Sequence, residues 1–222
     1  KITFELQNKH KGYYALWQKI VETSLNEVKK IYKDLNTTFD YWYGESDNYN
    51  YMEKTLEFLY QKNVIVESEG AKVINIAEDS DKLEMPPLIV IKSNGAVSYE
   101  ATDLACLYER MEDFNPDEIW YMTDKRQELH FTGTFRAAYK SGLVPPTTKL
   151  IFNGFGTMNG PDGKPFKTRD GGVMPLSNLL DMVTEECEKR LMESIIENRD
   201  KIAKTIAVAA IKYADLLPFR TT

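Results

Sequence analysis

Tyr99 and Asp103 lie four positions apart at the start of a predicted helix that follows the apolar run Leu88–Ile91. On a helix this spacing places a phenol and a carboxylate side by side on one face. A carboxylate accepts two parallel hydrogen bonds from a guanidinium group, a geometry that an ammonium group does not offer. The pair is a candidate guanidinium site. The alternative is that Asp103 is a solvated helix residue and Tyr99 a core aromatic.

Gln127 and His130 lie three positions apart on a second predicted helix, which follows a predicted strand at 118–122. Open α/β sheets bind ligands at the carboxyl ends of their strands, so both residues are candidates for substrate contact. His130 is suited to hydrogen-bond a substrate or a ribose. The alternative is a structural histidine, and the chain's other histidine, His10, has no assigned role.

Residues 155–172 contain five glycines and two prolines, which exclude a helix, together with three cations, Lys164, Lys167 and Arg169. Cations on such a loop can close over a polyphosphate and stabilise the charge that develops on a leaving pyrophosphate. The usual phosphate-binding patterns, G-x-x-x-x-G-K-[ST] and G-x-G-x-x-G, do not occur here. The alternative is an ordinary solvent loop. No metal-ligand set is expected.

The elements that must position these residues follow from the periodicity of apolar side chains. The strand at 88–91 is a continuous β-branched run, which predicts a strand buried on both faces in a parallel sheet. With it, the middle of the chain is predicted to alternate between strands and helices, as in half of a nucleotide-binding α/β fold. Predicted helices cover 13–35, 52–61, 99–111, 127–141 and 179–213, and predicted strands cover 39–43, 64–66, 72–76, 88–91, 118–122 and 150–152, with a hairpin turn at 68–70.

Composition indicates a globular protein, because 42% of the 222 residues are hydrophobic. The formal net charge of −6 provides no global attraction for nucleic acid. Cys106 and Cys187 form no C-x-x-C pattern, which favours a reducing, cytoplasmic compartment. The longest apolar stretch, Ile206–Ile211, is too short to span a bilayer, so no membrane partner is expected.

The stretch from Leu88 through Lys92-Ser93-Asn94-Gly95 to Tyr99, Asp103 and Ala105 resembles the SDG-x-x-x-Y-x-x-x-D-x-A segment of arginyl-tRNA synthetases, with Asn94 in place of the family's Asp. Further similar segments occur in the family's order over nearly the whole chain. They are Phe39-Asp40 with Gly44-Glu45-Ser46, then 67–71, 127–131, 162–169 with Gly171, and 212–216.

This resemblance implies a class I synthetase that activates arginine with ATP and transfers it to the terminal adenosine of its tRNA. ATP is then a substrate, with Mg²⁺ expected alongside it. The resemblance implies that Tyr99, Asp103 and Gln127 bind arginine. ATP would be bound by His130 and by the backbone around Gly156, Thr157 and Met158. The catalytic loop with Lys164, Lys167, Thr168 and Arg169 would correspond to the family's KMSKS loop, with Thr168 where its second lysine is expected.

The fold class implied is α/β, the second half of a class I synthetase Rossmann-like parallel-sheet catalytic domain with a connective insertion and C-terminal helices. The implied parts are a helical/β connective insertion at 1–85, the Rossmann-like half with the arginine pocket and KMSKS-like loop at 86–175, and a helical segment toward the anticodon-binding bundle at 176–222. No HIGH segment is present, so we expect a fragment that is inactive alone. Two alternatives stay open: a stand-alone arginine-binding or regulatory module, and another class I nucleotidyl-transferring enzyme.

Overall fold

The structure is a computed structural model that describes residues 5–6, 10–82, 84–156, 175–192 and 197–217. Its contacts divide the chain into two compact units. One, here called the site unit, is the continuous stretch Trp42–Gly156. The other, the helical unit, comprises the described residues of the stretches before and after it. The predicted division at residues 85 and 175 concerns functional parts of a synthetase and stays a prediction.

The site unit contains a three-stranded antiparallel sheet in the order β1-β2-β3. Its strands are β1 (Ile65–Ser68), β2 (Ala71–Ile74) and β3 (Leu88–Ile91). Glu69 and Gly70 join β1 to β2, and both have positive φ angles, 50° and 76°. Two left-handed residues are what a two-residue type I′ hairpin turn requires. The predicted hairpin is therefore confirmed.

Strand β3 forms where it was predicted, but the prediction that it lies in the parallel sheet and is buried on both faces is wrong. β3 pairs with β2 in antiparallel orientation, with Val73 opposite Ile89. Its side chains alternate, because Leu88 and Val90 are buried while Ile89 is 37% exposed. A four-residue apolar run does not distinguish a strand buried on both faces from a half-buried one next to a hairpin, since partner choice is a tertiary property.

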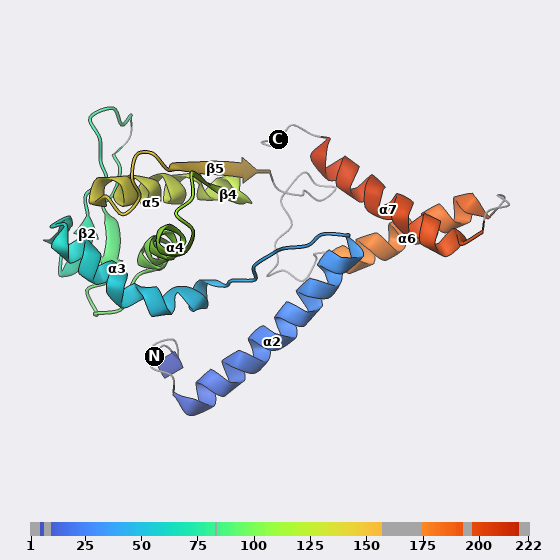
Figure 1. Ribbon diagram of the computed structural model, residues 1–222, viewed down its shortest axis with the longest axis horizontal. Coiled ribbons are helices and arrows are strands. Elements are labelled where there is room, and N and C mark those ends of the chain that lie inside the picture. Colours follow the sequence, from blue (N-terminus) through green and yellow to red (C-terminus); the bar gives the residue numbers. More distant parts are fainter. Residues whose placement is uncertain (1–4, 7–9, 83, 157–174, 193–196, 218–222) are drawn as a thin grey trace. The chain divides into compact units, whose positions relative to one another are not determined.

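The parallel sheet consists of β4 (Glu118–Asp124) and β5 (Lys149–Phe155), paired from Glu118 with Lys149 to Asp124 with Phe155. The 3₁₀ turn η2 (Lys125–Gln127) and helix α5 (Glu128–Ser141) connect the two strands. This strand–helix–strand unit was predicted and is confirmed, as is the helix α4 (Tyr99–Phe114) that precedes it. The fold class is mixed α/β with a parallel sheet (Figure 1).

Helix α4 begins at a defined residue because Ser98 caps it. The Ser98 hydroxyl accepts a hydrogen bond from the Ala101 amide at 3.0 Å and donates one to the Ile89 carbonyl at 2.5 Å. These bonds join the first turn of α4, which carries Tyr99, to strand β3. Helix α4 then packs against α3 (Tyr49–Gln61), with core residues that include Leu59, Leu104 and Leu107.

The helical unit contains α2 (Lys11–Asp34), α6 (Leu176–Leu191) and α7 (Arg199–Leu216). Helix α2 matches its predicted range, but the helix predicted over 179–213 is two helices that pack against each other. Asn198 ends the break between them with a positive φ of 59°. The strand predicted at 39–43 does not form. In the part of the chain that the structure describes, no helix combines the length and apolarity needed to cross a membrane.

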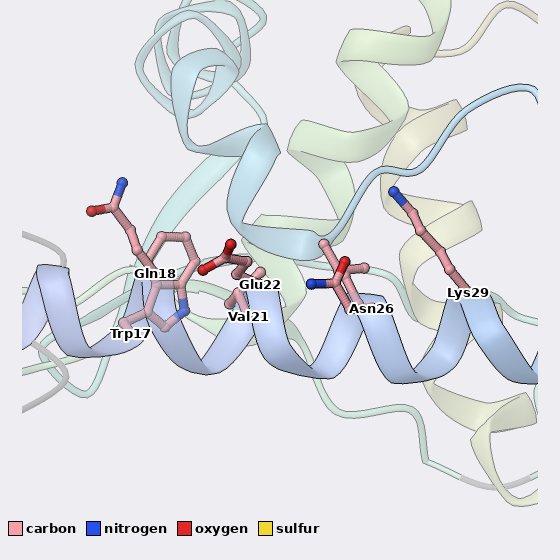
Figure 2. A pocket seen from close by; sticks show the side chains of 7 residues that line it. Trp17, Gln18, Val21, Glu22, Asn26 and Lys29 are labelled. Carbon is pink, nitrogen blue, oxygen red and sulfur yellow. The ribbon is translucent and has the colours of Figure 1, made fainter.

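No residue of α2 is buried in this structure. A shallow hollow runs along one side of the helix (Figure 2), and its lining alternates apolar and polar side chains. The lining residues are Trp17, Gln18, Val21, Glu22, Leu25, Asn26 and Lys29. All of them lie on one helix, so the hollow is an open surface feature and not an enclosed cavity.

Candidate functional site

Three of the predicted site residues meet between the first turns of α4 and α5. Tyr99 and Asp103 lie on α4, and His130 lies on α5. Helix α5 follows β4 of the parallel sheet, whereas α4 follows β3 of the antiparallel sheet. Open α/β sheets bind ligands at the carboxyl ends of their parallel strands, and His130 lies at that end of β4.

Asp103 and His130 form a direct pair. His130 Nε2 lies 2.7 Å from Asp103 Oδ2, and the two side chains are 18% and 13% exposed, His130 first. An ionised carboxylate only accepts hydrogen bonds, so the imidazole carries its proton on Nε2 and donates it. The carboxylate is thereby oriented by a residue 27 positions further along the chain.

Aromatic rings hold His130 from two sides. Its ring stacks on Tyr99, with centroids 4.7 Å apart and an interplanar angle of 28°. Phe131 contacts it edge-on at 5.0 Å and is itself stacked on Phe152 of β5 at 5.6 Å. The imidazole is therefore connected through Phe131 to the parallel sheet.

The site suits a planar cation. Among the described residues, no lysine or arginine nitrogen lies within 4 Å of the Asp103 carboxylate, so its charge is not neutralised by a permanent cation. Tyr99, four residues before Asp103 on α4, is 47% exposed, and its ring stacks on His130. A guanidinium group can hydrogen-bond to a carboxylate and also stack on an aromatic face.

Of the remaining predicted site residues, the structure describes two, Gln127 and Gly156. Gln127 is exposed at the end of η2, one turn before His130, and Gly156 is half-buried directly after β5. Thr157 and Met158 of the predicted ATP contact lie outside the described residues, as do Lys164, Lys167, Thr168 and Arg169 of the predicted catalytic loop. Among the residues that are described, no group of His, Cys, Asp and Glu side chains is arranged to hold a metal ion.

Two supporting contacts were not predicted. Arg110 of α4 donates a hydrogen bond to the hydroxyl of Tyr121 on β4 at 2.6 Å. Burial raises the pKa of the Tyr121 phenol, so it stays protonated and uncharged. The sequence carries no signal for this pairing beyond an arginine on an amphipathic helix and an alternating strand.

The second contact is a clamp formed by Arg136 of α5. Its guanidinium donates to both carboxylate oxygens of Asp81, at 2.6 and 2.8 Å. Lys140, four residues later, donates to the Ala77 carbonyl at 2.8 Å. The Arg136 hydrogen bond lowers the pKa of the Asp81 carboxyl. The clamp fixes the connection between β2 and β3 to the same helix that carries His130.

The parallel strand–helix–strand unit places the chain among the α/β proteins, whose ligands are commonly bound at the carboxyl ends of parallel strands. A sequence model of the family described as "tRNA synthetases class I (R), catalytic domain" matches residues 1–222. The chain belongs to this family, the catalytic domain of the class I synthetases for arginine. The family and the α/β class predicted from the sequence are confirmed.

Known arginine–tRNA ligases are similar in sequence to this chain. The arginine–tRNA ligase of Agathobacter rectalis is 46% identical over 223 residues, which cover 96% of this chain and 37% of that protein. That of Francisella tularensis is 46% identical and covers 97% and 36%. The chain therefore spans little more than a third of the length of these curated relatives.

Solved structures show the same fold. The arginyl-tRNA synthetase of Plasmodium falciparum matches with a TM-score of 0.83 and 27% identity, covering 100% of this chain and 37% of that one. The Thermus thermophilus arginyl-tRNA synthetase has a TM-score of 0.71 over 95% of this chain and 42% of that one. Its identity of 18% supports the fold alone.

Proposed function

We propose that this chain provides the side-chain pocket for arginine and part of the ATP site of an arginine–tRNA ligase. The observation that carries the proposal is the Asp103 carboxylate, which is largely buried and has no lysine or arginine partner among the described residues. A buried carboxylate without a cation is costly, and a bound guanidinium would supply that cation. The family to which the chain belongs uses arginine as its amino acid, which agrees with this chemistry.

In the proposed site, Asp103 accepts two hydrogen bonds from the substrate guanidinium and Tyr99 packs against its plane. Gln127 contacts the amino acid from the side of α5. Lysine is disfavoured because an ammonium group is not planar and cannot make the two parallel bonds. Citrulline has a similar shape but lacks the charge, so it loses the attraction to the carboxylate.

The ATP part of the proposal concerns the end of β5 and the segment after it. Gly156, Thr157 and Met158 contact ATP through their backbone. Lys164, Lys167, Thr168 and Arg169 act on the phosphates, where positive groups stabilise the pyrophosphate as it leaves. Mg²⁺ accompanies ATP as part of the substrate. The full-length enzyme, of which this chain is a part, binds the tRNA for arginine. It acts in the cytoplasm.

Calorimetric titration of the chain with L-arginine tests the pocket, with L-lysine and L-citrulline as matched ligands. We expect measurable binding of arginine, which Asp103→Asn abolishes, and much weaker binding of the other two. Equal binding of lysine would favour a different synthetase. Arginine binding by a protein that never supports ATP–pyrophosphate exchange, even at full length, would favour the stand-alone binding module.

A further inference from the structure

We infer that His130 is a positioning residue that sets the orientation of the Asp103 carboxylate for the substrate guanidinium. The inference rests on the proposed function, because it concerns the same arginine pocket. It differs from the ATP contact that the family resemblance implies for this histidine. The observation behind it is the 2.7 Å bond between His130 Nε2 and Asp103 Oδ2 across two helices.

A two-point grip on a guanidinium group depends on the plane of the carboxylate. The aspartate side chain can rotate about its terminal bond, and a rotated carboxylate offers only one oxygen in the right direction. The bond from His130 fixes Oδ2 and thereby the plane of the group. Each carboxylate oxygen has two acceptor directions, so Oδ2 can accept from the imidazole and from a guanidinium at once.

His130 can orient the Asp103 carboxylate because neighbouring aromatic rings hold the imidazole in place. The stack on Tyr99 and the edge contact with Phe131 restrict the imidazole ring. Phe131 is 6% exposed, so it belongs to the interior of the site unit. The orientation of Asp103 is therefore derived from the packed interior and not from α4 alone, which is how a precise binding group is supported.

The chemical type of the residue matters as well. An imidazole can donate the hydrogen bond while it is uncharged, and the carboxylate then keeps its full attraction for a substrate cation. A lysine or arginine at this position would form a permanent ion pair and compete with the ligand. The same bond also links Asp103 to Tyr99, since the histidine ring contacts both.

Two other roles for His130 make different predictions. If it contacts ATP, its removal weakens ATP binding and leaves arginine binding unchanged. If it merely occupies Asp103 until the substrate displaces it, its removal strengthens arginine binding. Positioning predicts that removal weakens arginine binding only.

The test measures KM for arginine and for ATP by pyrophosphate exchange in the full-length enzyme that carries this chain. His130→Ala removes the donor. His130→Gln retains an N–H near the Nε2 position. Leu129→Ala is the matched control, because Leu129 lies on the same turn and is 62% exposed. Thermal unfolding of every variant shows whether the fold is kept.

We expect His130→Ala to raise the KM for arginine roughly tenfold or more, since a hydrogen bond to a charged group is lost, while the KM for ATP stays within about twofold. His130→Gln should restore most of the arginine affinity, and Leu129→Ala should match the wild type. A rise confined to the KM for ATP, or a fall in the KM for arginine, would overturn the inference.

A second measurement keeps this test separate from the proposed function. The chain has two histidines, so the ring nitrogen signals of His130 are assigned by NMR with a His10→Gln variant. A hydrogen-bonded Nε2–H that Asp103→Ala abolishes supports the positioning contact, and its absence in the wild type refutes it. An enzyme without arginine-dependent exchange would refute the proposed function while this signal still decides whether the contact exists.

Discussion

At the scale of single residues, the Asp103 carboxylate is the group on which the proposed arginine pocket depends. Its carboxylate is 13% exposed, and among the described residues its hydrogen-bond partner is the His130 imidazole, which leaves the negative charge available to a ligand. Spacing from Tyr99 was enough to identify it as a candidate. Its contact with His130 was not predictable, because the two residues are far apart in the sequence and meet only when α4 and α5 pack together.

Asp103→Asn should weaken arginine binding by about 3 to 5 kcal/mol, because the substrate guanidinium would be held in a largely buried site without its counter-charge. The substitution keeps the shape of the side chain and an oxygen that can accept from His130. Calorimetry or the KM for arginine measures the loss.

Asp113→Asn is the control for this prediction. Asp113 lies on the same helix, and its carboxylate accepts from the Tyr51 hydroxyl at 3.0 to 3.1 Å on the surface. Its substitution should leave arginine affinity unchanged. An Asp103→Asn variant that binds arginine as tightly as the wild type would remove the basis of the proposed pocket.

At the scale of elements, α5 organises the site unit. It joins the two parallel strands, carries His130 in its first turn and holds the β2–β3 connection through Arg136. The clamp pairs a guanidinium with both oxygens of Asp81, and its strength depends on the ionisation of that carboxyl.

The lowered pKa of Asp81 predicts a pH dependence of stability. A carboxyl whose pKa is lower in the folded state stabilises the fold above its ordinary value of 3.8, and this contribution is lost as the pH falls through the lowered pKa. Urea unfolding of the wild type and of Asp81→Asn should therefore differ at neutral pH and converge below about pH 4. A difference that persists unchanged to pH 3 would contradict the clamp, and Arg136→Met should behave like Asp81→Asn.

Gly154 shows how closely β5 approaches its neighbours. A Cβ atom there would lie 2.7 Å from the ring of Phe152 and 3.0 Å from the Lys125 Cα. Gly154→Ala should lower the free energy of unfolding by about 1 to 3 kcal/mol, because the backbone on one side cannot move away cheaply. Gly44→Ala, where the nearest atom is 3.8 Å away, is the control and should be nearly neutral in chemical denaturation. A stable Gly154→Ala variant would mean that the strand end adjusts freely.

Helices were predicted more successfully than strand partners. The long helices α2, α4 and α5 follow from apolar periodicity, which is a local property. The aromatic run at 39–43 has high β propensity, yet no strand forms there, and β3 joined the hairpin in place of the parallel sheet. Both errors concern hydrogen-bond partners, which propensity does not specify.

At the scale of the whole molecule, the chain covers little more than a third of its curated relatives. We expect the 222-residue chain alone to show no arginine-dependent ATP–pyrophosphate exchange, because catalysis requires both substrates to be held at once and no HIGH segment is present. The full-length enzyme is the positive control. Exchange by the chain alone above a blank without arginine would show that these residues suffice for activation.

The order of the two units along the chain has a consequence for how the protein is made. The helical unit is discontinuous, since the whole of Trp42–Gly156 is translated between α2 and α6. At roughly 5 to 20 residues per second, the ribosome needs on the order of ten seconds for that stretch. During this interval α2 has been synthesised, whereas α6 and α7, the other long helices of its unit, have not. The helical unit can therefore be completed only after the whole site unit has been translated.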